Sequence, residues 1–382
     1  MQPRTLKSLK EHLSAYAFLA PALLILGAFG VFPLLYAFYV SVHRWRFKKG
    51  DVVGAANFVK ALGEPALVGR MLLGFALLGV AYWLWERAAR SDATARAGLR
   101  VVWAAALLGA GCFLILGLPG AVRTGDLDFY NGLKITVFYA AFSIPLQLSI
   151  ALLLAFALFN LGTKVGLLRL IYFLPYITPM IASAVVFRSL FSPQEHSIAN
   201  RVLTAFGSKP LGWLFENDSI ARVLLQGIFH VKGPDWVDAA FPSLALISVI
   251  LYNTWVYVGY NTVIFLAGLS TVPKELYEAA SLDGAGSWSV LRNVTIPLLS
   301  PTIFFLSMMS VIGTFKAFNH IYLMRTAGAQ GTLDSSSIVI FDEFFKAHNA
   351  GYASAMALCL FAVILTLTVL QNRLVGKRVF YG

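Results

Sequence analysis

Charged residues are scarce in this chain, and their scarcity excludes an ordinary soluble fold. Of its 382 residues only 13% are charged, whereas 58% are hydrophobic. Soluble domains carry about 25% charged residues. The apolar residues gather in runs long enough to cross a hydrocarbon core of about 30 Å as helices. The alternation over about ten residues that a membrane β-barrel needs is missing. The sequence therefore predicts an all-α polytopic membrane protein.

Cysteine is nearly absent as well. Cys112 and Cys359 both fall inside apolar runs, where a thiol behaves as a small hydrophobic group. No disulfide framework is predicted from them. The sequence also shows no internal repeat, no low-complexity tract and no clustered nucleophile or metal-ligand set. We therefore predict no catalytic residue, no metal site and no cofactor.

The net charge of +12 does not indicate a nucleic-acid partner. The basic residues flank the apolar runs, so contact with lipid headgroups of a bilayer is the simpler interpretation. Three of them, Arg4, Lys7 and Lys10, precede the first run. That run is about twice as long as the apolar part of a signal peptide. We interpret it as an uncleaved anchor and the first transmembrane helix.

Eight apolar segments follow one another along the chain. They cover residues 13–42, 69–86, 101–121, 133–160, 168–191, 242–269, 300–323 and 351–374. The second is short and is bordered by Arg70, Glu86 and Arg87. It either spans with its arginines reaching the interface or lies in the interface. We predict about eight transmembrane helices, and an even number places both chain ends on one side.

Two long segments lie between these runs. Residues 192–241 are rich in Pro and Gly and hold a predicted short helix at 220–229. Residues 324–350 begin with a Gly-rich turn and end with an aromatic patch. Long loops on compact proteins are often functional. Each segment is therefore either a solvated connector or a docking surface for a partner outside the membrane.

Residues 270–299 form a charged, Gly-broken segment between two apolar runs. Pro273 suits the first turn of a helix, and beyond it apolar and charged residues fall on opposite sides, as on an amphipathic surface helix. Asp283-Gly284-Ala285-Gly286 then breaks the helix, because Gly adopts a positive φ without steric cost. Ser287 is predicted to cap a second short helix that ends at Ile296-Pro297. Two short helices would form a compact knob at the membrane surface.

Three motifs within this segment stand in register, namely Glu278-Ala279-Ala280, Asp283-Gly284-Ala285 and Ile296-Pro297. Together they resemble the coupling loop of permease subunits of binding-protein-dependent ABC importers. Other motifs are similar to the carbohydrate branch of that family, which includes maltose, glycerol-3-phosphate and multiple-sugar permeases. They are Val31-Phe32-Pro33, Ser143-Ile144-Pro145, Phe173-Leu174-Pro175-Tyr176, Leu266-Ala267-Gly268-Leu269 and Gly351-Tyr352-Ala353. The resemblance covers residues 13–60 and 130–382.

The resemblance implies a type I importer permease fold in three parts. Residues 1–69 would hold the N-terminal tail, the first transmembrane helix and an outer loop. Residues 70–121 would form an extra transmembrane hairpin that the family's six-helix core does not need. Residues 122–382 would form the core permease domain with the coupling loop at 270–299. The protein would be multi-pass in a bacterial or archaeal cell (inner) membrane, with cytoplasmic N- and C-termini.

The same resemblance implies the partners. They are a second homologous permease, two ATP-binding subunits and an extracytoplasmic solute-binding protein. The ATPase contact would include Glu278, Ala279, Ala280, Asp283 and Gly284. The chain has no G-x-x-x-x-G-K-[ST] phosphate loop, so we predict a transport subunit and not an enzyme, with ATP hydrolysed elsewhere. The alternative is a secondary carrier or a membrane-embedded enzyme without an ATPase; a carrier would often show inverted repeats.

Polar residues inside the apolar runs define a predicted substrate path for a sugar or a related polyol or phosphate ester. Such side chains face protein or water, because contact with lipid is costly. The candidates are Gln147, Asn253, Tyr257, Asn261, Lys316 and Asn319. For each Asn or Gln alone, hydrogen bonding between helices is the alternative. Lys316 either reaches the outer surface or places a cation in the path. His320, one turn further, is predicted to be interfacial.

Overall fold

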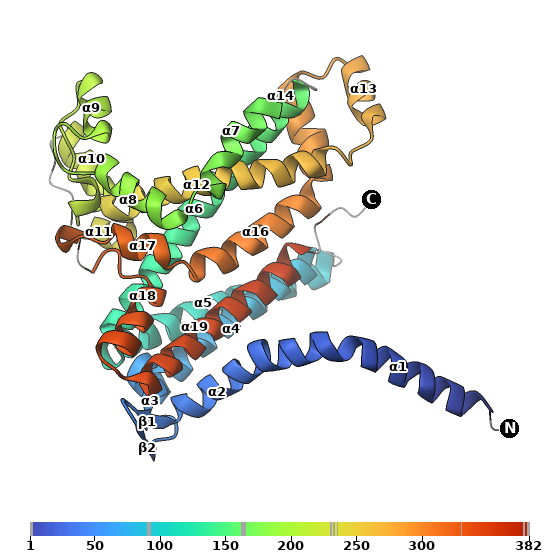
Figure 1. Cartoon of the computed structure of the whole chain (residues 1–382), viewed down its shortest axis with the longest axis vertical. Coiled ribbons are helices and arrows are strands. Elements are labelled where there is room, and N and C mark those ends of the chain that lie inside the picture. Colours follow the sequence, from blue (N-terminus) through green and yellow to red (C-terminus); the bar gives the residue numbers. More distant parts are fainter. Residues whose placement is uncertain are drawn as a thin grey trace. The chain divides into compact units, whose positions relative to one another are not determined.

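The computed structural model describes residues 3–89, 93–161, 166–229, 231, 234, 236–329, 331–376 and 379. These fall into two compact units. Unit 1 comprises Met1–Leu127 and Ile340–Cys359, and unit 2 comprises Asp128–Val339 and Leu360–Gly382. Figure 1 shows that most of the described chain is helical.

Unit 1 begins with a long apolar helix and a small hairpin. Its first elements are α1 (Pro3–Leu26), the π-helical turn η1 (Gly27–Val31), α2 (Phe32–Ser41), the antiparallel strands β1 (His43–Trp45) and β2 (Lys49–Val52), and α3 (Ala56–Leu62). Ser14–Ser41 is apolar and long enough to cross a membrane, which agrees with the predicted first span. The Asn57 side-chain amide donates to the carbonyls of Ser41 and His43, at 2.7 and 3.1 Å. This amide fixes α3 against the end of α2.

Helices α4 (Pro65–Ala89) and α5 (Ala93–Thr124) form a closely packed hairpin in unit 1. Small residues allow the close packing, as is usual between membrane helices. A Cβ on Gly117 would lie 2.6 Å from the Met71 nitrogen, and one on Gly74 would lie 2.7 Å from Leu114. Because α4 begins at Pro65, the second apolar run is longer than predicted and long enough to span.

A polar cluster ties the C-terminal part of unit 1 to its middle. This part holds the π-helical turn η6 (Asp342–Lys346) and the start of α19 (Ala350–Leu374), which continues into unit 2. The Tyr352 hydroxyl donates to Asp126 at 2.5 Å. The Lys60 Nζ lies 3.6 Å from the centre of the Tyr352 ring. Segments far apart in sequence are thereby joined.

Unit 2 is built around one buried helix, α12 (Leu244–Leu269). Two apolar clusters form on it, one around Ile250 with residues of α6 and α8, the other around Phe265 with residues of α6 and α16. Its other long helices are α6 (Leu127–Asn160), α7 (Gly166–Ile177), α8 (Met180–Leu190) and α16 (Ser300–Phe315).

Short helices occupy the two ends of α12 (Figure 1). Its N-terminal end carries α9 (Ile198–Ala205), η3 (Trp213–Phe215), α10 (Ile220–Phe229), α11 (Trp236–Ala240), α17 (Asn319–Met324) and η5 (Ala327–Ala329). The prediction of a helix at 220–229 is confirmed by α10. The C-terminal end leads into α13 (Lys274–Leu282) and α14 (Ser287–Val290). A further short helix, α18 (Ser336–Phe341), follows in the chain.

Among the described residues, six helices are long and apolar enough to cross a membrane, and two bent pairs raise this to eight if each pair is one span. The prediction of about eight spans is therefore confirmed. The predicted span 168–191 corresponds to one of these bent pairs, because α7 and α8 meet at 92°. Pro179 has no N–H to continue the helix and disfavours a helical Thr178.

The predicted run 300–323 is also interrupted. Helix α16 ends at Phe315, and α17 starts at Asn319. Tertiary contacts override the apolar pattern here, because α17 packs on α8 and its His320 bonds to Tyr139 of α6. At its other end, α16 bends by 71° from the helix before it.

Candidate functional site

The predicted break in the 270–299 segment is a Schellman motif. Helix α13 starts directly after Pro273 and ends at Leu282. Gly284 then has φ +73°, and its N–H donates to the Ser281 carbonyl at 3.1 Å. The next N–H, of Ala285, donates to the Ala280 carbonyl at 2.9 Å. This pair of bonds requires a left-handed residue, which glycine supplies without strain, so the predicted role of Gly284 in the turn is confirmed.

Helix α13 protrudes from unit 2. No residue of α13 is buried, and Leu282 is 90% exposed. Tyr277 contacts the body of unit 2 through the Phe159 ring, with 5.7 Å between the ring centroids. Glu278 and Ala279 face outward and Ala280 is half-buried. Such a helix offers both charge and apolar surface to a partner.

The second short helix begins at Ser287 and ends at Leu298, within one residue of the predicted end at Ile296-Pro297. It runs through α14, the π-helical turn η4 (Leu291–Thr295) and α15 (Ile296–Leu298). Ser287 is its first residue and makes no capping bond, since Gly286 precedes it in an extended conformation. Leu291 and Thr295 are buried and anchor it, whereas Trp288 is 68% exposed. The exposed knob therefore consists of α13 and the start of α14.

Substitution Gly284→Val is expected to loosen this turn. A β-branched residue at a positive φ is strained by about 1–2 kcal/mol, so local opening should become about 5- to 30-fold easier. Hydrogen exchange at the Ala285 amide of the full chain in detergent measures this change. Gly286→Val is the matched control, because Gly286 has φ −71° and open space around it. Equal exchange in both variants would contradict the assignment.

A cavity of about 360 Å³ lies within unit 2. Small-molecule sites occupy about 300–1,000 Å³, so its size suits a small solute. All six residues predicted for a substrate path line it: Gln147 on α6, Asn253, Tyr257 and Asn261 on α12, Lys316 after α16, and Asn319 on α17. Ser310 and Thr314 also line it and were missed. The spacing of Met309, Ser310, Gly313 and Thr314 on one helix face could have revealed them.

Amide groups connect two walls of the cavity. The Asn253 side-chain N–H₂ donates to Ser143 Oγ at 2.6 Å and to Gln147 Oε1 at 3.3 Å. Hydrogen bonding between helices, the alternative for these residues, is thus present, although both residues also line the cavity. Asn261 differs: its Nδ2 is buried and makes no hydrogen bond to the described part of the chain. A buried donor without a partner is destabilising, so Asn261 is suited to receive a ligand acceptor.

Aromatic rings give the cavity flat surfaces. Tyr260 stacks on Tyr176 with ring centroids 4.5 Å apart, and Tyr257 meets the same ring edge-on at 5.9 Å. Tyr257 and Tyr260 both line the cavity. Tyrosine combines an apolar face with a polar hydroxyl. The rings can therefore contact apolar faces of a solute while their hydroxyls bond to its oxygens.

His320 is buried, so its predicted interfacial position is wrong. It is 4% exposed, and its Nε2 lies 2.8 Å from the Tyr139 hydroxyl. The turn after α16 carries it inward with α17. Burial lowers the pKa of His320 to about 4, because desolvation disfavours the charged form. At neutral pH it therefore presents a neutral imidazole to the cavity.

Lys316 lies directly after α16, as the C-cap residue. A cation is favoured there by the partial negative charge of the helix C-terminus. Among the described residues that line the cavity, it is the only charged one. Within the predicted apolar run 300–323, Lys316 thus lies at a junction between two helices.

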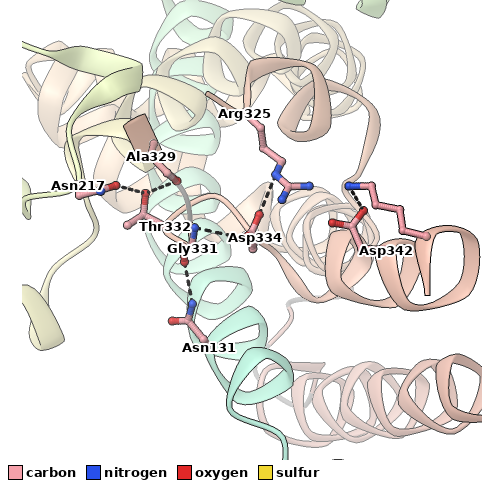
Figure 2. A network of polar contacts seen from close by, with 9 residues as sticks. Asn131, Asn217, Arg325, Ala329, Gly331, Thr332, Asp334 and Asp342 are labelled. Atoms are coloured by element: carbon pink, nitrogen blue, oxygen red, sulfur yellow. Dashed lines mark hydrogen bonds and ion pairs between the residues drawn. The ribbon is translucent and has the colours of Figure 1, made fainter. Parts of the chain in front are cut away.

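A polar network holds the segment after α17 against α6 (Figure 2). Arg325 Nε lies 2.8 Å from Asp334 Oδ1, and the Gly331 N–H donates to Asp334 Oδ2 at 3.1 Å. Asn131 of α6 donates to the Gly331 carbonyl at 2.7 Å. The loop that follows Asn319 and His320 is thereby fixed, which keeps both residues at the cavity.

Comparison with known proteins places these features in a family. Residues 136–381 match the family model described as binding-protein-dependent transport system inner membrane component. The lactose transport system permease protein LacF of Rhizobium radiobacter is 30% identical over 253 residues, which cover 64% of this chain and 76% of LacF. The sn-glycerol-3-phosphate transport system permease protein UgpA of Agrobacterium fabrum (strain C58 / ATCC 33970) is 27% identical over 258 residues, covering 67% and 79%.

A solved structure shares the fold. It is a bacterial alginate ABC transporter in complex with an alginate pentasaccharide-bound periplasmic protein. The alignment has a TM-score of 0.64 at 18% identity and covers 100% of both chains. The predicted type I importer permease fold is confirmed by this likeness.

Proposed function

Because this chain belongs to the family of binding-protein-dependent transport system inner membrane components, we propose that it is the permease subunit of an ATP-driven importer. With a second permease it forms the path for a sugar or a related polyol or phosphate ester. The names of its relatives, which refer to lactose and sn-glycerol-3-phosphate, support this class of solute. The carrying observation is that one helix, α12, lines the cavity and leads directly into the exposed α13.

The exposed knob is the contact for an ATP-binding subunit. Its contact residues are the five predicted ones, of which Glu278, Ala279, Asp283 and Gly284 are exposed and Ala280 is half-buried. Neither carboxylate forms an ion pair within the described residues, so both remain available to a partner. Ala279 and Gly284 carry little or no side chain, which lets a partner approach the backbone closely.

Motion of the knob reaches the cavity through rigid helices. A short connection joins α12 to α13, and the second short helix is followed directly by α16. Both long helices carry cavity residues, such as Asn253 on α12 and Thr314 on α16. When ATP binding draws two such knobs together, these helices move the cavity walls. Rigid elements of this kind are suitable carriers of coupling between distant sites.

The multi-pass chain lies in a bacterial or archaeal cell membrane with the knob and both termini on the cytoplasmic side. The short helices at the other end of α12 then face outward and meet the solute-binding protein. The predicted division into residues 1–69, the hairpin 70–121 and the core 122–382 stays part of this proposal. In it the hairpin packs at the periphery, towards lipid.

Isolation of the tagged chain from its native membrane tests the proposal. We expect an ATPase and a second permease to be isolated with it, and ATP hydrolysis in proteoliposomes to rise when the loaded solute-binding protein is added. The reason is that the chain has no phosphate loop of its own. Solute movement by the isolated chain, with no ATPase present, would show a secondary carrier instead and refute the proposal.

A further inference from the structure

We infer that the cavity of unit 2 selects a carbohydrate that carries a negative charge, either a carboxylate or a phosphate group. This inference rests on the proposed function, since it names the solute class of the same path. It depends on the charged side chains and the hydrogen-bond donors that line the cavity, and on which of these donors already have a partner.

The first observation is an uncompensated cation. Lys316 lines the cavity, and none of the described residues that line it is an aspartate or glutamate. Lys316 forms no ion pair within the described residues. The carboxylates of Asp334 and Asp238 in the same unit are bound by arginines, at 2.8 and 2.7 Å. Lys316 is exposed, so its ammonium group is accessible to an anion that enters the cavity, and opposite charges a few ångströms apart attract each other.

The second observation is an unpartnered donor in the same cavity. Asn261 is 2% exposed, and its Nδ2 makes no hydrogen bond within the described chain. By contrast, the Asn253 amide donates to two oxygens. Carboxylate and phosphate oxygens accept hydrogen bonds and do not donate them, and bonds to charged acceptors are the stronger ones. Lys316 therefore suits the charged group of a solute, and Asn261 offers a donor to another of its oxygens.

If Lys316 served only to stabilise α16, the experiment would give a different result from the one expected for charge selection. A lysine at a helix C-terminus stabilises the helix by about 0.3–1 kcal/mol, and this effect does not depend on the solute. Charge selection, in contrast, appears only when charged and neutral solutes are compared. It also weakens with salt, because the screening length falls from about 10 Å at 0.1 M to about 3 Å at 1 M.

The test measures binding to the full chain in nanodiscs with two matched pairs of radiolabelled probes. The pairs are galacturonate trisaccharide with the neutral galactose trisaccharide, and glucose 6-phosphate with glucose; they distinguish a carboxylate from a phosphate. In at least one pair the charged probe should bind about tenfold more tightly or better, as expected for a hydrogen bond to a charged group. Lys316→Gln should bring this ratio close to one, and Lys316→Arg should preserve it. Lys134→Gln removes an exposed charge from α6, away from the cavity lining, and should leave the ratio unchanged.

Three results overturn the inference. They are equal binding of both members of each pair by the wild type, a ratio that survives Lys316→Gln or high salt, and binding of no probe. Failure of the proposed function is distinct, because it would appear as solute movement without an ATPase. A complex that binds an ATPase yet prefers neutral sugars would refute the charge selection alone.

Discussion

Substitution Gly259→Ala is expected to destabilise unit 2 severely. Gly259 lies on α12 where that helix meets α7, and a Cβ there would overlap the carbonyl oxygen of Tyr172. Because this oxygen belongs to the backbone, it cannot rotate away from the new methyl group, and α7 and α12 must move apart. Overpacking of a core costs about 1–3 kcal/mol, and we expect the upper end of this range. The yield of monodisperse protein and its melting temperature in detergent measure the effect.

A matched control is available in α4. Gly79 is also a glycine inside an apolar helix, but a Cβ there meets nothing within 4 Å. Gly79→Ala should be neutral or stabilising by up to about 1 kcal/mol, since alanine is the better helix former. A Gly259→Ala protein as stable as this control would mean that α7 and α12 do not approach each other as described.

Substitution Glu278→Arg is expected to release the ATP-binding subunit while the membrane part stays folded. Glu278 is exposed on α13. Within the helix its loss removes at most an i, i+4 pair with Lys274, worth about 0.3–0.5 kcal/mol. In a protein interface, loss of a buried hydrogen-bonded charge partner costs about 2–5 kcal/mol. Retention of the ATPase on the tagged chain, and solute uptake, should therefore fall by about thirtyfold or more.

Glu195→Arg provides the comparison for this prediction. It makes the same charge change at an exposed position in unit 2, between α8 and α9, at the other end of α12. ATPase retention should be unaffected there, and both variants should keep the wild-type melting temperature. If the complex with Glu278→Arg stays intact, Glu278 lies outside the contact.

The membrane helices could be predicted from the sequence because the thickness of the bilayer fixes the length of the apolar run that each helix needs. A run of about 20 apolar residues has few folded alternatives in a membrane, and helices such as α2 and α19 end close to the predicted limits. The turn at Gly284 was also predictable, since a positive φ strongly favours glycine. The polar residues inside apolar runs line one cavity, as expected where lipid contact is costly for such groups; their part in a substrate path stays a prediction.

The breaks in the helices could not be predicted, because contacts distant in sequence determine them. No residue near Phe315 in the sequence forces α16 to end. The hydrogen bond between His320 and Tyr139 forms only where the chain turns after α16. The hydroxyls lining the cavity were overlooked for a different reason. Thr314 Oγ1 donates to the Ser310 carbonyl at 2.8 Å within its own helix. A hydroxyl satisfied in this way is tolerated in an apolar run and gives little signal.

The close approach of α12 to α7 at Gly259 has a mechanical consequence. If α12 rocks, the tightest contact acts as its fulcrum. At a rise of 1.5 Å per residue, the arm from Gly259 to Leu269 is about 15 Å and the arm to Leu244 is about 22 Å. A displacement at the Leu269 end, which leads into α13, is thus reversed in direction and enlarged by about half at the Leu244 end. Helix α12 would then act as a lever that tilts about Gly259, so that a pull on its end at one side of the membrane moves its other end and opens the path on the opposite side.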